Sequence, residues 1–229
     1  MKILTVIPAR GGSKSVLKKN IKSLNGRPLI EYTFDSLKHI DFDTDIIVST
    51  DDKEIANISV KNKINVPFIR PSDLSSDTAL TKDVLLHALK FMEKEKKIKY
   101  SSILLLQPTS PFRTSSDIND SVKRFKSGDY DSLVSVTDVC GNHPFRMKEI
   151  NNGYLYNFIE QGFEDMRPRQ ELTKVYIRNG SIYLMNRSVL LNNNVVGERC
   201  CPYVMDELSS INIDTVLDFK LAELISKGI

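Results

Sequence analysis

Cysteine, histidine and long apolar runs are scarce in this sequence of 229 residues. The three cysteines, Cys140 and the adjacent pair Cys200 and Cys201, lack the two-residue spacing of zinc knuckles and redox motifs, which indicates a reduced, cytoplasmic protein. The apolar run Ile3–Ile7 is too short for a signal-peptide core, and no segment approaches the ~20 apolar residues of a membrane helix. The sequence therefore predicts neither an exported protein nor a membrane protein.

A strong net charge and clustered histidines are also missing. The 32 Lys and Arg residues nearly balance the 29 Asp and Glu residues, so the formal net charge is only +3. No continuous basic stripe with interleaved aromatic residues is present. These features exclude a general nucleic-acid-binding surface. The histidines His39, His87 and His143 have no metal-ligand spacing, so none is expected to be catalytic.

The sequence does contain a regular alternation of strand-like and helix-like segments. A length of 229 residues is near the upper limit for one hydrophobic core, so a single domain over 1–229 is expected. The predicted strands are Ile3–Ile7, Asp45–Ser49, Val66–Ile69, Ile103–Leu106, Asp131–Val136, Ser181–Met185 and Ser209–Ile213. Intervening helices, such as Val216–Ser226, indicate a layered α/β sheet. The alternation breaks between about 137 and 179, which predicts an inserted lobe.

The loop after the first predicted strand combines glycines with basic residues. It comprises Ile7–Lys14 (IPARGGSK) and continues to Lys19 and Asn20. Glycines let the backbone approach an anion closely, and the basic side chains suit a triphosphate. The spacing matches neither the Walker A loop nor the G-x-G-x-x-G dinucleotide fingerprint. The pattern thus predicts a polyphosphate site of another kind, with a flexible basic surface loop as the alternative.

Two further segments favour a ligand site over that alternative. In open α/β sheets, ligands bind outside the carboxyl ends of strands, where the polar loop after Leu106 would also lie. Asp214 follows a predicted strand and precedes a helix. Its carboxylate could hold Mg²⁺, which prefers oxygen ligands, or it could simply cap the helix. One aspartate could do both.

Several polar motifs occur together and in order. They are Ile7–Lys14, Lys19–Asn20, Arg70–Thr78, Leu106–Arg113 (LQPTSPFR), Arg167–Gln170, Asn179–Tyr183 (NGSIY) and Ile213–Thr215. Over almost its whole length, the chain resembles the acylneuraminate cytidylyltransferase family, also called CMP-sialic acid synthetases. The order of these motifs is specific, although each motif alone is weak.

The resemblance implies a three-layer, Rossmann-like fold of the nucleotide-diphospho-sugar transferase type, with a mainly parallel mixed sheet. The inserted lobe at about 137–179 would build a homodimer. The implied reaction moves CMP from CTP to the anomeric hydroxyl of N-acetylneuraminic or N,N'-diacetyllegionaminic acid and releases pyrophosphate. Mg²⁺ would be the cofactor, and the product would serve surface glycan biosynthesis. Neither a nucleic acid nor a membrane is an expected partner.

The resemblance also assigns roles to individual residues. Catalytic roles fall to Arg10, Lys19 and Asp214. The nucleotide site would comprise Ala9, Arg10, Gly11, Ser13, Lys14, Lys19, Asn20, Arg70, Asp77 and Thr81. The sugar site would comprise Gln107, Thr109, Ser110, Arg146, Arg169, Asn179 and Tyr183, with Arg169 contributed by the partner subunit. Asp214 would bind the metal, with Asn212 as a second candidate ligand.

Two departures from the family pattern affect these assignments. Asn212 replaces the first carboxylate of the family's Asp-x-Asp pair, which weakens the electrostatic hold on Mg²⁺. Arg178 lies one residue before Asn179, whereas many sialic acid synthetases have an arginine two residues before the asparagine. In a regular strand this offset turns the side chain to the opposite face. The pattern resembles the legionaminic acid branch.

Three alternatives remain at this level. Pseudaminic acid and the eight-carbon Kdo are other acidic sugars that such enzymes use, although Lys19–Asn20 and Asn179–Gly180 favour the nine-carbon group over Kdo. A non-catalytic protein that only binds CTP is the third. A panel of sugars assayed with CTP separates the three.

Overall fold

A six-stranded mixed sheet forms the centre of the computed structural model, which describes residues 2–160, 162 and 166–228. The strand order is β10-β6-β9-β5-β1-β4. The strands are β1 (Ile3–Pro8), β4 (Thr44–Ser49), β5 (Ser102–Leu106), β6 (Ser132–Asp138), β9 (Tyr176–Asn186) and β10 (Cys200–Val204). Strand β9 is antiparallel to both neighbours and the other pairs are parallel. The remaining strands therefore end at one side of the sheet, here called the carboxyl edge.

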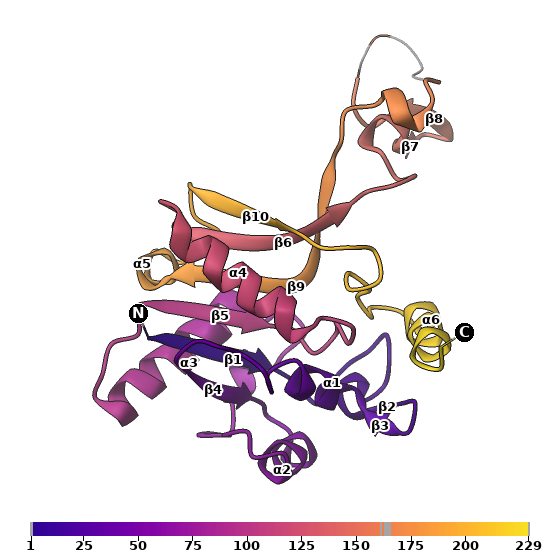
Figure 1. Cartoon of the computed structure of the whole chain (residues 1–229). Coiled ribbons are helices and arrows are strands. Elements are labelled where there is room, and N and C mark those ends of the chain that lie inside the picture. The colour runs from indigo at the N-terminus through magenta and orange to yellow at the C-terminus, as the bar shows by residue number, and fades with distance from the viewer. Residues whose placement is uncertain (1, 161, 163–165, 229) are drawn as a thin grey trace.

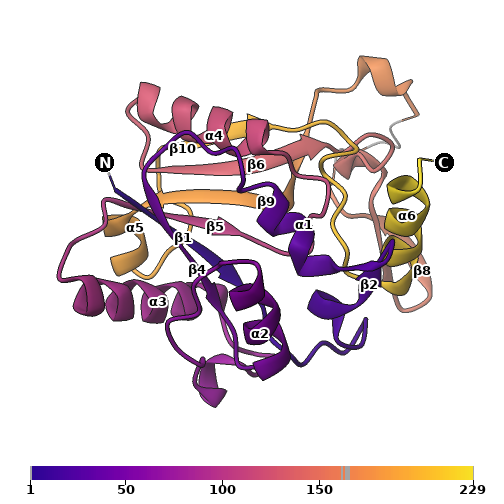
Figure 2. The ribbon, with the colours of Figure 1, turned by 60° about the horizontal axis from the view of Figure 1, so that its bottom comes forward.

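Helices cover both faces of this sheet (Figures 1 and 2). One apolar cluster joins the strands to α1 (Leu29–Asp35), α2 (Lys53–Lys61) and α4 (Ser115–Ser127). A second cluster, on the other face, joins them to α3 (Thr81–Lys96) and α5 (Arg187–Leu191). This arrangement confirms the predicted three-layer α/β fold. The apolar strand β1 is buried on both sides, which explains its continuous rather than alternating pattern.

Short elements complete the chain. They are η1 (Lys19–Ile21), β2 (Ser23–Leu24), β3 (Arg27–Pro28), η2 (Ser72–Leu74), η3 (Pro144–Arg146), β7 (Lys148–Asn151), β8 (Tyr154–Asn157), η4 (Arg169–Glu171) and the last helix, α6 (Val216–Ser226). Among the described residues, none of the helices has the length and apolarity of a membrane span.

Two of the predicted strands are wrong. Ser209–Ile213 forms a turn and an irregular segment, and the edge position belongs instead to β10. Strand β10, which was not predicted, contains Pro202, and an edge strand tolerates proline because one side of its backbone stays unpaired. Val66–Ile69 makes only isolated bridges, through Ile69 and the preceding Asn65. The bounds of α6 confirm the predicted helix.

A lobe leaves the sheet between β6 and β9, beyond the carboxyl edge (Figure 1). It contains the antiparallel hairpin β7–β8. The two flanking strands extend further than predicted, so the lobe spans about 139–175 rather than 137–179. Its hairpin exposes large apolar side chains, among them Ile150 at 78%, Tyr154 at 70% and Leu155 at 66%. This surface has the apolar character of an interface.

Helix α6 joins the two ends of the chain. Phe219 and Ala222 are buried in one cluster with Val16 and Leu24, which belong to the amino-terminal segment. Asn25 adds a hydrogen bond to the carbonyl of Ser226. The residues just before α6 are thereby held beside the loop that follows β1.

Removing the cap of α6 should lower the stability of the protein and also change its expected activity. The hydroxyl of Thr215 accepts a hydrogen bond from the Asp218 amide at 3.2 Å, and the Asp218 carboxylate accepts one from the Thr215 amide at 2.7 Å. Thr215→Ala is expected to lower the free energy of unfolding by about 1 kcal/mol in urea titrations. Thr114→Ala, which removes the matching capping box of α4, is the control. Both should lose similar stability, but only Thr215→Ala should also change turnover, because Asp214 directly precedes Thr215. Equal turnover in the two variants would contradict this expectation.

Candidate active site

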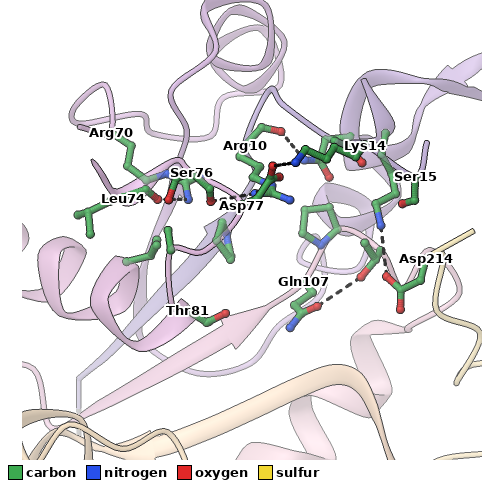
Figure 3. A pocket seen from close by; sticks show the side chains of 18 residues that line it. Arg10, Lys14, Ser15, Arg70, Leu74, Ser76, Asp77, Thr81, Gln107 and Asp214 are labelled. Carbon is green, nitrogen blue, oxygen red and sulfur yellow. Dashed lines mark hydrogen bonds and ion pairs between the residues drawn. The ribbon is translucent and has the colours of Figure 1, made fainter. Parts of the chain in front are cut away.

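A cavity of about 560 Å³ opens at the carboxyl edge (Figure 3). Eleven of the predicted site residues line it: Arg10, Ser13, Lys14, Lys19, Asn20, Arg70, Asp77, Thr81, Gln107, Thr109 and Asp214. They come from the loop after β1, the segment before α3, the start of α3, the loop after β5 and the residues before α6. The structure therefore brings together segments from both ends of the sequence.

Two predicted nucleotide-site residues shape the loop after β1 without lining the cavity. Ala9 is fully buried, and its amide bonds to the carbonyl of Ser49 at 2.9 Å. Gly11 donates its amide to Asp51 at 3.0 Å. A Cβ on Gly11 would lie 2.5 Å from a carboxylate oxygen of Asp52, the N-cap of α2. Glycine is therefore required here by close packing of the loop against α2.

The cations of this loop are paired within the protein. The Asp77 carboxylate forms ion pairs with Arg10 at 3.0 Å and with Lys14 at 2.5 Å. The hydrogen bond from Lys14 holds the pKa of the Asp77 carboxyl below its ordinary value. Arg10 also donates to the carbonyl of Ser76 at 2.9 Å. Asp77 thus neutralises part of the charge of these two cations, and its predicted contact with the nucleotide stays a prediction.

The ion pairs of Asp77 predict a gain of affinity on neutralisation. Asp77→Asn should tighten CTP binding by roughly two- to fivefold, the range expected for exposed ion pairs, because the triphosphate no longer competes with an internal carboxylate. Isothermal titration calorimetry with CTP measures this. Asp73→Asn, on the same segment before α3, is the matched control. Weaker binding by Asp77→Asn alone would instead show that Asp77 contacts the nucleotide directly.

Lys19 connects the loop after β1 with the segment before α6. Its ammonium donates to the carbonyl of Ile213 at 2.7 Å and lies 3.3 Å from a carboxylate oxygen of Asp214, 195 residues away in sequence. The Lys19 side chain is only 13% exposed, whereas that of Asp214 is 68% exposed. A partly buried cation beside an accessible carboxylate suits a phosphorus centre that gains negative charge during transfer.

Asp214 and Asn212 are the residues that could hold a metal ion. The described residues contain no group of three or more His, Cys, Asp or Glu placed to bind one. The side-chain nitrogen of Asn212 donates to the Asp214 carboxylate at 2.5 Å. The side-chain oxygen of Asn212 is buried and has no described partner. One carboxylate and one amide oxygen fit Mg²⁺, which commonly takes one or two protein oxygens and completes its shell with substrate phosphates and water.

The predicted sugar residues are divided between the cavity and its surroundings. Gln107 and Thr109 line the cavity, and their side chains are 3.4 Å apart. Ser110 and Tyr183 are buried, at 1% and 9% exposure, and do not line it. Asn179 is directed into the protein, so it holds β9 in place and does not line the cavity. Its partners are the hydroxyls of Ser135, at 2.6 Å, and Ser210, at 2.9 Å.

The two predicted arginines of the lobe do not reach the cavity of their own chain. Arg146 donates to the carbonyl of Arg167 at 3.1 Å. Arg169 lies 3.7 Å from Asp138 and lines a separate cavity of about 490 Å³ at the base of the lobe, with Cys140 and His143. The expected contribution of Arg169 to a partner subunit's site stays a prediction.

Arg113 is a residue of the site region to which the sequence reasoning gave no role. It is fully buried and donates to the carbonyls of Gln107 at 3.2 Å and Ser181 at 2.9 Å, and to the hydroxyl of Thr33 at 3.0 Å. Burial lowers the pKa of its guanidinium to about 9. The arginine therefore fixes the end of β5 against β9 and α1. The sequence feature that could have pointed to Arg113 was its place at the end of the motif Leu106–Arg113.

Arg178 faces opposite to its neighbour Ile177, as a regular strand predicts, but a bulge changes how both residues relate to Tyr183. Val134 pairs with Tyr183, and Val136 pairs with Arg178, with a register shift between the two pairs. Paired residues share a face, and so do residues two apart in β6, so Arg178 and Tyr183 share a face although they lie five positions apart in the chain. Gly180, with φ of 75°, lies in this irregular part of β9. The bulge therefore places Arg178 on the face of Tyr183, which a regular strand would not do.

The chain is similar to a known family and to individual proteins of that family. The sequence profile described as "Cytidylyltransferase" matches residues 4–155. The CMP-N,N'-diacetyllegionaminic acid synthase of Legionella pneumophila is 34% identical over 97% of this chain and 95% of its own length. The N-acylneuraminate cytidylyltransferase of Escherichia coli is 32% identical over 96% of this chain and 51% of its own length.

A solved structure supports the assignment of the fold. A CMP-2-keto-3-deoxy-manno-octonic acid synthetase in complex with CTP superposes with a TM-score of 0.71 over all of both chains, at 17% identity. The profile match covers more than half of the chain, and relatives above 30% identity cover nearly all of it. This chain therefore belongs to the cytidylyltransferase family of nucleotide-transferring enzymes.

Proposed function

We propose that the protein transfers CMP from CTP to the anomeric hydroxyl of a nine-carbon acidic 2-keto sugar, N-acetylneuraminic or N,N'-diacetyllegionaminic acid, and releases pyrophosphate. The observation that carries this proposal is the contact of Lys19 with Asp214 in a cavity that also contains Arg10 and Lys14. The names of the relatives given above support the sugar class. Their nearly equal identities to this chain do not separate the two sugars.

The cavity has distinct ends that suit the parts of CTP. Arg10 and Lys14 supply positive charge for the phosphates. At the other end, Arg70 and Val84 lie beside Thr81, where an apolar wall and a few polar groups suit a base. Arg70 is 5% exposed and donates to the carbonyl of Ser49 at 2.8 Å, so its position is fixed before any ligand binds. The nucleotide would therefore lie along the loop after β1.

The proposed chemistry is a single displacement at the α-phosphorus. The anomeric oxygen of the sugar forms a bond to the α-phosphorus as the bond from that phosphorus to the bridging oxygen of pyrophosphate breaks. Lys19 and Arg10 stabilise the charge that develops on the phosphoryl oxygens and the leaving group. The anomeric hydroxyl gives up its proton, for which Asp214 is the candidate acceptor. Mg²⁺, held by Asp214 with Asn212 beside it, would neutralise charge on the phosphates when bound.

Two further assignments belong to the same proposal. The exposed apolar hairpin β7–β8 supports a homodimer formed through the lobe, in which Arg169 would reach the sugar of the partner's cavity. A reaction that consumes CTP supports a place in the cytoplasm. Static light scattering of the purified chain tests the first assignment, and a monomer at micromolar concentration would contradict it.

A sugar panel tests the function directly. The purified protein is given CTP, Mg²⁺ and N-acetylneuraminic, N,N'-diacetyllegionaminic or pseudaminic acid, or Kdo, and pyrophosphate release is measured. The proposal expects turnover with a nine-carbon sugar of the first two types. Preference for pseudaminic acid or Kdo would reassign the sugar. Binding of CTP without pyrophosphate release with any sugar would indicate a non-catalytic CTP-binding protein.

A further inference from the structure

Arg178 is a basic residue at the carboxyl edge that the proposed chemistry does not use. It is exposed, and the described part of the chain gives it no hydrogen bond or ion pair. The cations proposed to bind the phosphates differ from Arg178, because each of them already pairs with a carboxylate. Arg10 and Lys14 pair with Asp77, and Lys19 pairs with Asp214. A guanidinium without a counter-ion next to a substrate cavity is free to bind an anionic group.

The bulge of β9 places Arg178 on the side of the sheet that carries Tyr183. The two side chains are close enough to interact electrostatically, because burial raises the pKa of Tyr183 and the charge of Arg178 opposes that shift. Val136, opposite Arg178, is only partly buried. The sheet face is therefore open around Arg178, whereas the central strands are covered further from this edge.

Gly180 relates Arg178 to the cavity. A Cβ built on Gly180 would lie 3.5 Å from the amide oxygen of Asn212 and 3.7 Å from that of Gln107, so the backbone of β9 borders the residues around the cavity floor. Arg178 lies two residues earlier, a distance of about 6.6 Å along extended chain. A long arginine side chain can span this distance to a molecule seated over Gln107.

The strand order separates Arg178 from the phosphate end. Strand β5 lies between β9 and β1, so the loop that carries Arg10 and Lys14 is two strand positions away. Two such positions correspond to about 10 Å. Arg178 is thus placed to meet the acceptor substrate and not the triphosphate.

We propose that Arg178 binds the carboxylate of the acidic sugar, an inference that rests on the proposed function. The planar guanidinium can form two parallel hydrogen bonds with a carboxylate, a geometry that lysine lacks. This role makes Arg178 a determinant of the preference for acidic over neutral sugars.

Steady-state kinetics with both substrates varied test this role. Arg178→Ala is expected to raise KM for the acidic sugar by about 10- to 100-fold, the loss expected for a charge-assisted bidentate contact, with KM for CTP changed less than about twofold. Arg178→Lys should recover part of the loss. The wild-type enzyme should discriminate against the sugar carboxamide, and Arg178→Ala should not. Arg199→Ala is the matched control, because Arg199 is exposed, pairs with Asp129 and precedes β10 at the opposite edge.

Each outcome decides the proposal. An unchanged KM for the sugar in Arg178→Ala, or an equal rise in both KM values, would overturn it. A shift to monomer in light scattering without a change in sugar KM would show that Arg178 serves an interface between subunits and would also overturn it. If the wild-type protein releases no pyrophosphate with any acidic sugar, the proposed function fails and this role fails with it. If the wild type turns over and Arg178→Ala has an unchanged KM for the sugar, the proposed function stands and only the role of Arg178 is wrong.

Discussion

Replacing Lys19 with methionine is expected to lower kcat by about 10²–10³-fold, the usual cost of removing one directed donor from a transition state. Lys19 is the cation that touches the segment before α6, through Ile213 and Asp214. Because only 13% of its side chain is exposed, methionine keeps the packing of the aliphatic stem and removes the charge alone. Single-turnover measurements with CTP and the preferred sugar separate this effect from substrate binding.

Lys18 provides a matched control on the adjacent residue. Its ammonium pairs with Glu54 at 2.9 Å and its side chain is 59% exposed, so it faces away from the Lys19 contacts. Lys18→Met should leave kcat within about twofold, since exposed ion pairs contribute little. If Lys19→Met turned over as fast as the wild type while remaining folded in urea titrations, Lys19 would have no part in the chemical step.

Loss of the Asp214 carboxylate is expected to have the second large effect. Asp214→Asn should raise the half-saturating Mg²⁺ concentration at least about tenfold, because a hard cation loses the carboxylate proposed to bind it. Asn212→Asp should act in the opposite direction and lower the Mg²⁺ requirement, because it supplies a second carboxylate two residues away. Activity measured over a range of Mg²⁺ after removal of metal with EDTA distinguishes the two directions.

Glu198→Gln controls for the change in net charge. Glu198 is exposed and lies just before β10, away from the cavity, so its removal should leave the Mg²⁺ titration unchanged. Identical Mg²⁺ titrations for Asp214→Asn and the wild type would remove Asp214 from the metal site. A higher Mg²⁺ requirement in Asn212→Asp would show that its amide is needed for some other contact, such as the one it donates to Asp214.

Local patterns predicted much of the scaffold. The apolar run Ile3–Ile7 corresponds to a buried central strand, and the amphipathic segment Val216–Ser226 corresponds to a helix with the same bounds. Both succeed because the pattern that defines the element lies within the element. The strand predicted at Ser209–Ile213 failed because its apolar residues serve a different contact. Ile213 is buried against α6 and the amino-terminal segment, and its amide bonds to the carbonyl of Thr109.

Sequence patterns likewise predicted only part of the candidate site. Sequence motifs predicted the basic loop after β1 and the aspartate before α6 as parts of one site, and the structure places both in the lining of one cavity. The internal pairing of Asp77 with Arg10 and Lys14 could not be predicted, because it depends on where the segment before α3 folds back. Arg113 could not either, because its three acceptors come from separate elements.

The residues in their linear order specified a layered α/β chain with a basic loop after its first strand and an aspartate before its last helix, since hydrophobic periodicity, glycines and prolines act over a few neighbouring residues. Folding in three dimensions set which charges are paired, which carbonyls Arg113 holds and which face Arg178 occupies. Those properties depend on distances between segments as much as 195 residues apart, such as Lys19 and Asp214, and on one irregular strand pairing around Gly180. Such distances and registers arise only when the whole sheet has assembled.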